Sequence, residues 1–328
     1  MTRYAKNMGY VGIGVQADKG TAVDPSQFIK YQGSPTMTPE MVYEQYNEGG
    51  DSPYPGITLK ERHNPNGSFE LLARPSIAGL LFAALLGADA VAGEAAPYTH
   101  TITPSAYDDM PWVTIERSIA DVIVERVKDA RITEIEISGE PGKPIVLSVS
   151  YQGLTSSSET AAQEATYSAE MPFIFWQGTY TADAVNISAE VSEFSITMTN
   201  VFDEDEQHNQ IVRNEMTLIR REIETSFSYK LDSDNTADYE AVYYALDGSP
   251  AEEMYEGSLK IALEYGETAG VRGLEVDIPN IVHTQRVLEL DSGSDETTAF
   301  ECEGHAFYKV DDGFCEVVVK SNDSTTYV

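Results

Sequence analysis

Cationic side chains are scarce in this sequence. Its 328 residues hold 21 Lys and Arg against 54 Asp and Glu, which gives a formal net charge of −33 at pH 7. Proteins bind nucleic acid tightly by neutralising phosphates with cations, so this balance argues against tight nucleic-acid binding. It does not exclude a surface that faces nucleic acid without holding it. An acidic excess is also typical of proteins from high-salt cytoplasm, where carboxylates keep the surface solvated.

Cysteine is nearly absent as well, with two residues in the chain. The sequence Asp-Asp-Gly at 311–313 predicts a hairpin turn. Such a turn places Cys315 close to Lys309 and leaves Cys302 far along the opposite strand. We therefore expect two free thiols in a protein of a reducing compartment.

Long hydrophobic runs and export signals are missing too. The first eight residues carry charged or polar side chains where a signal peptide would be apolar. The longest apolar run, 77–86, is too short to span a bilayer. We expect no secretory signal peptide, no membrane span and a soluble protein.

Motifs of catalysis and metal binding are the last absence. The histidines have no zinc-site spacing; they are His63, His100, His208, His283 and His305. Gly12 and Gly14 imitate part of a dinucleotide fingerprint, but no buried strand precedes them. The acidic run 203–206 lacks the glycine and distant glutamate of a calcium-binding EF-hand loop, which favours a hairpin tip. We expect no enzyme, no cofactor and no bound metal.

The sequence does carry strand periodicity, and it carries a similar order of segments twice. A strand pattern at 67–72 leads to an apolar segment at 77–86, as a pattern at 225–231 leads to 237–246, each segment with a glycine just after it. Hairpin strands also recur: 132–138 with 145–151 in the first half, and 285–291 with 297–302 in the second. A repeat of this size indicates duplicated domains rather than a solenoid of small units.

This periodicity favours antiparallel sheets, because apolar side chains fall mostly on one side of each segment. We predict a mainly β protein with two tandem antiparallel β-sandwich or barrel modules, each with one short α-helix. The expected parts are a glycine-rich, irregular N-terminal arm at 1–30, module 1 at 31–154, a linker at 155–170 and module 2 at 171–328.

Local signals place a helix and a break in the first module. Pro75 and the spacing of the apolar residues after it predict a helix that ends at Gly87. The segment 237–246 is the expected second helix. Asn-Pro-Asn-Gly at 64–67 predicts a turn between two separate strands.

In their order along the chain, several segments resemble those of siphophage-type tail tube proteins, the major tail proteins of long-tailed viruses. They are GIGVQ at 12–16 with KGTA at 19–22, PYTHTITP at 97–104, PFIF at 172–175 with FSITMTN at 194–200, REIETSF at 221–227 and GHAF at 304–307. The resemblance covers nearly the whole chain, and it rests on the order of these segments, since none of them is catalytic.

The resemblance implies a structural virion protein that assembles in the host cytoplasm into stacked rings. The rings would form a hollow tail tube through which viral DNA passes without tight binding. The implied partners are copies of the chain itself, adjacent rings, and tail terminator and tail-tip proteins. Two modules per chain favour a homotrimeric ring with pseudo-six-fold symmetry over a homohexamer. A tail-tip, baseplate or surface-adhesin β-sandwich that binds a partner is the alternative.

The resemblance also points to candidate residues by position. Contacts between rings are expected on two hairpin loops, at Tyr46, Asn47, Glu48, Asp51 and Tyr54, and at Asp203, Glu204, Asp205 and Glu206. An acidic lumen wall is expected to include the strand residues Glu134, Glu136, Glu222 and Glu224. Glu134 and Glu136 share one face of a strand because they are two residues apart. Alternation alone does not say which face would line a lumen.

Overall fold

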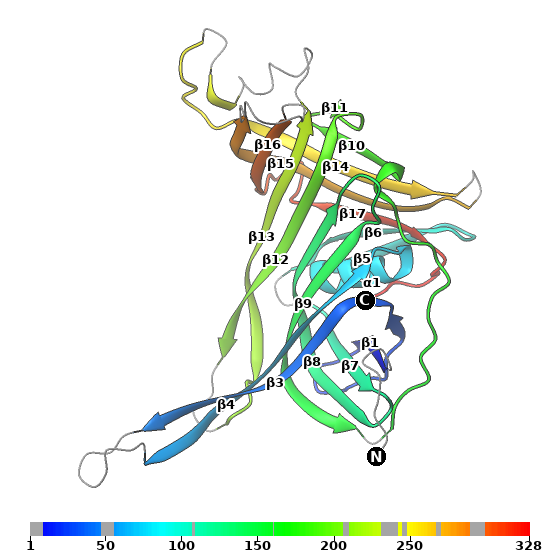
Figure 1. Ribbon diagram of the computed structural model, residues 1–328, viewed down its shortest axis with the longest axis vertical. Helices are drawn as coiled ribbons and strands as arrows, with labels where there is room; N and C mark the ends of the chain where they lie inside the picture. Colours follow the sequence, from blue (N-terminus) through cyan, green and yellow to red (C-terminus); the bar gives the residue numbers. More distant parts are fainter. Residues whose placement is uncertain are drawn as a thin grey trace, which may run out of the picture.

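The computed structural model is mainly β: strands hold 65% of the residues and helices 7%, in an antiparallel arrangement. The predicted fold class is confirmed. The structure describes residues 9–46, 56–106, 109–159, 161–205, 210–230, 242–244, 248–266, 270–288 and 299–328. Figure 1 shows an elongated body from which the β3–β4 hairpin projects at the lower left.

The elements follow one another with short connections. The first half holds β1 (Gly9–Gln16), β2 (Gln27–Ile29), β3 (Tyr31–Tyr46), β4 (Ile57–Leu72), α1 (Pro75–Leu86), β5 (Gly87–Ala92), β6 (Tyr98–Pro104), β7 (Trp112–Ile119), β8 (Ile123–Gly139) and β9 (Val146–Glu159). The second half holds the short 3-10 helix η2 (Phe175–Gln177), β10 (Gly178–Ala182), β11 (Val185–Asn186), β12 (Val191–Asp205), β13 (Glu215–Lys230), β14 (Glu256–Tyr265), β15 (Arg272–Leu288), β16 (Ala299–Ala306) and β17 (Glu316–Ser321).

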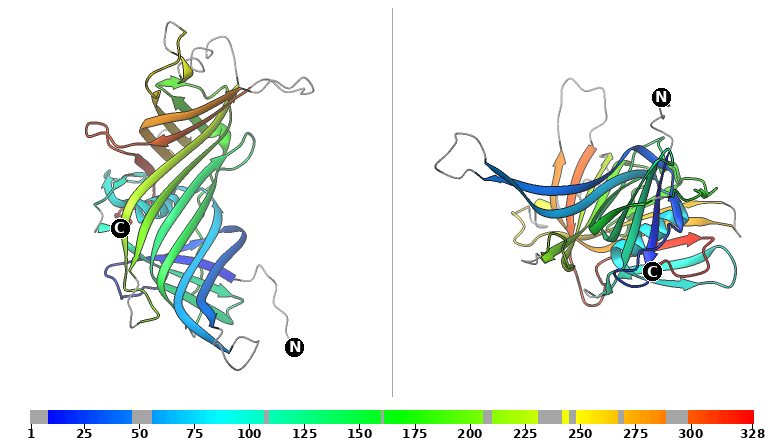
Figure 2. Two further views of the ribbon diagram at one scale, coloured as in Figure 1. Left: turned by 90° about the vertical axis from the view of Figure 1, so that its left-hand side faces the viewer. Right: turned by 90° about the horizontal axis from the view of Figure 1, so that it is seen from below.

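Eight of these strands form one continuous antiparallel sheet. The hydrogen-bonded order is β3, β4, β9, β8, β12, β13, β16 and β15. The pairing of β8 with β12 joins the two halves of the chain. Figure 2, left, shows these strands side by side, from blue β3 to orange β15.

The strand pairings of the two halves follow the same pattern. In the first half, β3, β4, β9, β8, β7 and β1 pair in that order. In the second half, β12, β13, β16, β15, β14 and β10 do the same. Strands β17, β6 and β5 continue from β15 in that order. The two remaining strands are short: β2 pairs with β1, and β11 pairs with β10.

Helix α1 fills the core behind the sheet. All of its residues are buried, which fits its composition of Ile, Leu, Phe and Ala. Pro75 begins the helix, and Gly87 ends it at a φ of 101°, a left-handed conformation that favours glycine. The predicted helix is confirmed in its bounds. The second expected helix, 237–246, lies almost entirely outside the described residues.

Residues from beyond β9 contact both ends of α1, in addition to the backbone N of Ser105, which donates to the carbonyl of Leu86 at 2.8 Å. At the first turn, the carboxylate of Glu170 accepts hydrogen bonds from the backbone N and the hydroxyl of Ser76, each at 3.0 Å. At the last turn, Asn200 of β12 donates to the carbonyl of Leu85 at 2.8 Å, and Arg221 of β13 donates to that of Leu86 at 3.1 Å. An anion at the start and a cation at the end of a helix suit its dipole.

The N-terminal stretch differs from the irregular arm we expected. Residues 9–16 form β1, which pairs with β2 and along its whole length with β7. Its glycines permit a close approach: a Cβ on Gly12 would lie 2.6 Å from the Pro25 side chain, and one on Gly14 would lie 2.8 Å from the carbonyl oxygen of Asp24. Glycine here allows tight packing of strand and loop rather than disorder.

Two further expectations differ from the structure. Residues 155–159, the start of the expected linker, are the end of β9 and pair with β8. The turn expected at 64–67 is absent, because β4 runs unbroken through it. Pro65 lies opposite Pro39 of β3, and two prolines facing each other need no hydrogen bond between them, so the ladder continues.

The C-terminal residues are fixed over the buried side of β5 and β6. His100 of β6 is fully buried; its Nδ1 lies 3.0 Å from Asp89 and its ring stacks on Tyr327, with the ring centroids 4.3 Å apart. Burial alone would lower the pKa of His100, but its hydrogen bonds to Asp89 and to the Asp323 carbonyl outweigh it and raise the pKa. Among the described residues, no helix is both long and apolar enough to cross a bilayer.

Candidate functional site

The candidate site is the polar face of the eight-stranded sheet. Side chains alternate along each strand, so every second residue points away from the core. The other face of the same strands is apolar and buried, for example at Phe69, Val149, Ile135, Ile196 and Phe227. We call the outward-facing side the acidic face, because its glutamates gather there: Glu40, Glu70, Glu134, Glu136, Glu193, Glu222, Glu224, Glu301 and Glu303.

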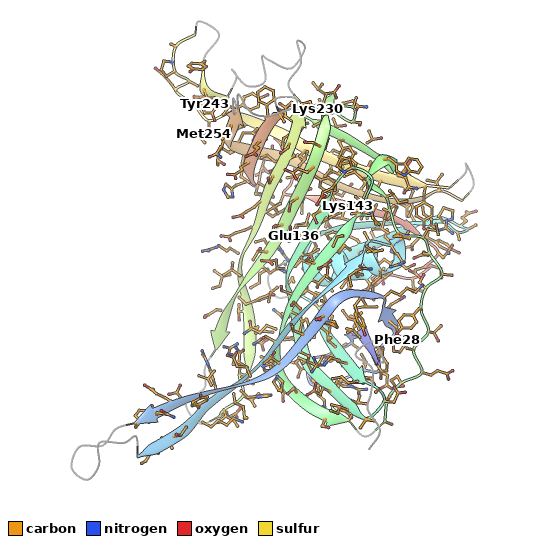
Figure 3. All side chains as sticks on the ribbon, viewed as in Figure 1. Phe28, Glu136, Lys143, Lys230, Tyr243 and Met254 are labelled. Carbon is orange, nitrogen blue, oxygen red and sulfur yellow. The ribbon has the colours of Figure 1, made fainter. Side chains whose placement is uncertain are left out.

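The register brings all four glutamates expected for a lumen onto this face. Thr197 of β12 lies opposite Glu136 of β8 on one side and Glu224 of β13 on the other. One step along, Thr199 lies between Glu134 and Glu222 in the same way. The four carboxylates therefore stand in two rows across the middle of the sheet, where Figure 3 labels Glu136.

Hydroxyl groups hold the two glutamates of β8. Ser195 donates to Glu136 Oε1 at 2.9 Å, and Thr199 donates to Glu134 Oε2 at 3.5 Å. Both glutamates are half-buried, whereas Glu222 and Glu224 are exposed. The hydroxyls of β12 thus fix carboxylates along the join between the two halves of the chain.

Cations compensate part of this charge. Arg220 Nε lies 2.6 Å from Glu222 Oε1, and His305 Nδ1 lies 3.8 Å from Glu224 Oε1. Both pairs are exposed, so solvent screens them and each contributes little. Lys230 lies at the upper end of β13, away from Glu136 (Figure 3). The acidic face therefore presents a surplus of carboxylates to solvent, which attracts cations and repels polyanions.

Sequence reasoning missed the other members of the acidic face. Glu70 lies opposite Ser148 of β9, and Glu301 and Glu303 lie opposite Ser228 and Ser226 of β13. Their alternation with buried neighbours was a readable signal, since each lies two residues from another polar position on its strand. Their common side depends on pairings between distant strands, which no local pattern gives.

Four of the candidate contact residues lie within the described residues, at or near the ends of their strands. Tyr46 ends β3 and Asp203 lies in β12; Glu204 and Asp205 also belong to β12, where the description covers their backbone. Asn47, Glu48, Asp51, Tyr54 and Glu206 lie outside the described residues. The hydroxyl of Tyr46 donates to Glu44 at 2.9 Å and to Glu61 at 3.2 Å, and these hydrogen bonds raise the pKa of Tyr46 to about 12.

The β3–β4 hairpin carries exposed apolar side chains on the part that projects from the body, in blue at the left of Figure 2, right. Met41 and Tyr43 point to one side of the hairpin. Ile57 and Leu59 lie opposite Tyr46 and Glu44, so they point to the other side. Scattered exposed apolar residues are ordinary, but several of them on one projecting element favour an interaction site. This apolar hairpin surface is a feature that the sequence reasoning did not identify.

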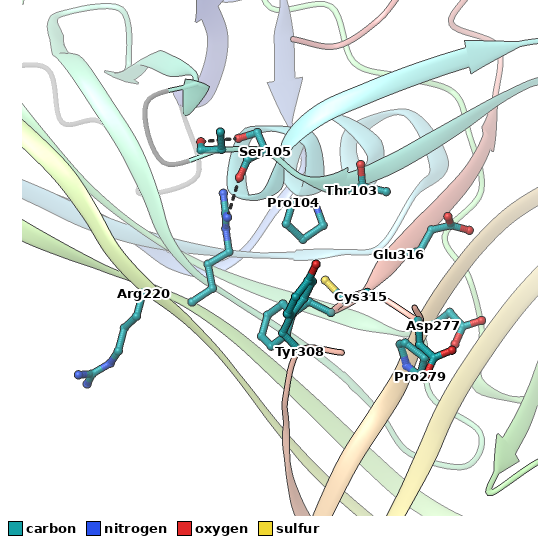
Figure 4. Close-up of a pocket in the computed structure, with 14 residues that line it drawn as sticks. Thr103, Pro104, Ser105, Arg220, Asp277, Pro279, Tyr308, Cys315 and Glu316 are labelled. Atoms are coloured by element: carbon teal, nitrogen blue, oxygen red, sulfur yellow. Dashed lines mark hydrogen bonds between the residues drawn. The ribbon is translucent and has the colours of Figure 1, made fainter. Parts of the chain in front are cut away.

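A cavity of about 710 Å³ lies between β6, β13, β15 and the segment before β17 (Figure 4). Its lining includes Arg221, which donates to the carbonyls of Ser105 and Leu86, and Cys315. Burial raises the pKa of Cys315 to about 12, so its thiol stays protonated and unreactive. Cys302 and Cys315 form no disulfide, as predicted, and both are buried. In the described part of the chain, no three His, Cys, Asp or Glu side chains group as metal ligands would.

The acidic face and the projecting hairpin are thus two candidate surfaces for function. A family model described as phage tail tube protein matches residues 7–290. That match spans both halves of the sheet, from β1 to β15. The comparison with curated proteins gives no match.

Proposed function

The chain belongs to the phage tail tube protein family, and from this premise we propose that it closes into rings whose acidic face lines the channel for viral DNA. Membership of the family makes it a structural component of the virion tail that assembles with other tail proteins. The rings, the passage of DNA, the assembly in the host cytoplasm and the contacts with tail terminator and tail-tip proteins are our proposal. The same membership favours a structural role over an enzymatic one.

The observation that carries the proposal is the continuity of the sheet across both halves. Eight antiparallel strands expose one acidic face, while α1 and the other strands cover the opposite face. A ring closed with that covered side inward would fill its own centre with core. The acidic face is therefore the side that suits an open channel.

The number of strands favours three copies per ring. Three copies contribute about 24 strands to the ring. If these strands lie about 4.8 Å apart and are tilted by about 40°, the closed barrel has a backbone diameter of about 50 Å. One copy would close to about 16 Å, too narrow for a duplex inside, and six would close to about 95 Å. The matching strand order of the two halves supports two tandem modules, hence pseudo-six-fold symmetry in a trimer.

The acidic face suits a channel for DNA because it offers few cationic groups that would bind phosphates. DNA-binding surfaces neutralise phosphates with Lys and Arg, and this face does the opposite. Like charge lowers adhesion at every step along the channel, so the genome slides. The charge surplus of the whole chain supports the same conclusion.

Electron microscopy of the purified protein tests this proposal. We expect rings or tubes whose averaged projections show six-fold density made by three chains, with a native mass of three copies per ring. A protein that stays monomeric at concentrations where tail tubes form would contradict the proposal and favour the tail-tip or adhesin alternative. Six chains per ring would contradict the trimer alone.

We further propose that the β3–β4 hairpin contacts the adjacent ring. Changing Met41 and Tyr43 to serine should leave rings intact but weaken their stacking at least about tenfold, because burying one exposed apolar side chain contributes about 1.5–3 kcal/mol. Tube length at fixed protein concentration is the measurement. The role of residues 47–55 and of 203–206 stays a prediction.

A matched control removes two exposed apolar side chains elsewhere. Met254 and Val310 lie outside the hairpin and are exposed to a similar or greater degree. Their change to serine should leave tube length unaltered. Tubes of normal length from the hairpin variant would show that this surface does not mediate stacking.

A further inference from the structure

Among the described residues, the sheet has two edges where a strand pairs with one neighbouring strand only; in β3, the carbonyl of Met37 also accepts a hydrogen bond from Arg117 Nη2 at 3.2 Å. Among the described residues, β3 pairs along its length with β4 and with no other strand. At the other edge, β15 pairs with β14 up to Val282 and with β16 from Ile281 onward, and His283 N still donates to the carbonyl of Tyr255 at 3.1 Å. Residues 284–288 therefore have one partner strand among the described residues. Unpaired edges are templates for pairing with another chain.

The pairing of β8 with β12 inside the chain joins strands that correspond to those at the two free edges. Residues 134–139 of β8 lie beyond its contact with β7, and they pair antiparallel with residues 194–199 of β12. In this internal seam Glu134 lies opposite Thr199, and Glu136 lies opposite Thr197. In the other half, β15 corresponds to β8, and β3 corresponds to β12.

Irregularities in the ladders fix this correspondence residue by residue for β8 and β15. The β8–β9 ladder skips Thr133, and the β15–β16 ladder skips Thr284. The β7–β8 ladder is interrupted between Val127 and Ala130, as the β14–β15 ladder is between Ile278 and Ile281. Both comparisons give one offset, under which Gln285 corresponds to Glu134 and Val287 to Glu136.

The hairpins of β3 and β12 align in the same way. The β3–β4 ladder skips Glu61 after pairing Val42 with Arg62, and the β12–β13 ladder skips Ile219 after pairing Val201 with Arg220. Under this offset Glu40 corresponds to Thr199, and Thr38 corresponds to Thr197. Bulges are positioned features of a sheet, so their coincidence in both pairs of strands makes the register of the two halves comparable.

We propose that β3 of one copy pairs antiparallel with β15 of the next copy, in the register of the internal seam. Gln285 then lies opposite Glu40 of the next copy, and Val287 lies opposite Thr38. This inference deepens the proposed function, on which it rests, because it names the strands and the register that close the ring. The contact is head-to-tail, so it generates a closed ring or an open helix rather than an isolated dimer.

Pro39 makes the partner of the β3 edge specific. Because Pro39 and Pro65 face each other without a hydrogen bond, the backbone of Pro39 points to the free edge, where it accepts but does not donate. Two β3 strands paired with each other would lack a donor on both strands. Pairing with β15 lacks a donor on one strand only, so the second copy binds through β15.

Disulfide trapping tests the register. In the double variant Val287→Cys with Thr38→Cys, oxidation of assembled tubes should join neighbouring copies into covalent dimers and closed trimers. Facing residues bring their Cβ atoms within about 5.5 Å, close to what a disulfide requires. The native thiols of Cys302 and Cys315 are buried, and unsubstituted protein under the same oxidation gives the background.

Two matched pairs calibrate the result. Glu136→Cys with Thr197→Cys places the same pair in the internal seam and should close within one chain. Val287→Cys with Thr36→Cys shifts the register by two residues and should cross-link at least about tenfold less, because diagonal neighbours lie about 7–8 Å apart. Cross-links are read on denaturing gels and located by mass spectrometry.

The outcomes separate this inference from the function beneath it. Tubes that form but cross-link as well through the shifted pair, or through neither pair, overturn the register and leave the tube function standing. Unsubstituted protein that forms neither rings nor tubes overturns both. If the variants alone fail to assemble, a density map of the unsubstituted tube shows which strand lies beside β15, and any strand other than β3 overturns the inference.

Discussion

Replacing Glu134, Glu136, Glu222 and Glu224 with glutamine should leave tubes intact and make them retain DNA. The four side chains stand in two rows on the acidic face and contribute nothing to the apolar core on the other side of the sheet. Glutamine keeps their size and the hydrogen bonds from Ser195 and Thr199. Losing four charges per copy removes repulsion from a channel in which every ring faces the phosphates.

We expect a change on the order of tenfold in DNA retained by the tubes at low salt, which corresponds to about 1.4 kcal/mol. The difference should vanish near 1 M salt, where the screening length falls to about 3 Å. Ejection from virions that carry the variant should slow. Retention is measured by co-sedimentation of DNA with tubes across a salt series.

A control of equal charge separates position from net charge. Glu94, Glu164, Glu252 and Glu253 are exposed and lie outside the eight-stranded sheet. Their change to glutamine alters the charge of the chain by the same amount and should leave DNA retention unaltered. Equal retention by the two quadruple variants would show that the acidic face does not line the channel.

Truncating Ile196 to alanine should cause the largest loss of stability among single substitutions in the seam. Ile196 of β12 is fully buried and lies opposite Ile137 of β8 on one side and Thr225 of β13 on the other. Removing a buried isoleucine side chain costs about 2–5 kcal/mol, because apolar contacts are lost and a cavity is left. The free energy of unfolding of natural domains is about 5–15 kcal/mol, so this loss is a large part of the total stability.

The midpoint of urea denaturation measures this loss, followed by circular dichroism at low protein concentration so that assembly does not contribute. Ile219 is the matched control, because it is the bulge residue of β13 and half exposed. Its change to alanine should shift the free energy of unfolding by less than about 0.5 kcal/mol. Similar midpoints for the two variants would mean that the seam is not part of the cooperative core.

The sequence predicted features that depend on neighbouring residues. Alternation gave most strands and put Glu134 and Glu136 on one side of theirs, and the spacing after Pro75 gave the helix that the structure contains. These signals are local, because one strand or one helix decides which of its own side chains share a face. The free thiols of Cys302 and Cys315 followed from a local turn in the same way.

The features it missed depend on distant partners. β1 looked irregular because its glycines serve contacts with Pro25 and Asp24, which no periodicity reveals. The sequence predicted a break in β4 at Pro65. Pro65 does not interrupt the ladder because it faces Pro39, which lies on another strand. The seam between β8 and β12 pairs two distant segments, and neither segment shows this pairing by itself. Because the seam could not be predicted, the extent of the acidic face could not be predicted either.

The closure of α1 has a consequence for synthesis. The carbonyls of Leu85 and Leu86 receive their partners from Asn200 and Arg221, which follow 115 and 135 residues later in the chain. The carbonyl of Leu86 also accepts from the backbone N of Ser105 at 2.8 Å, so a nascent chain translated as far as β9 already holds part of this closure. It still lacks the two side chains from β12 and β13, and we expect the helix end to be completed only once translation has passed Arg221.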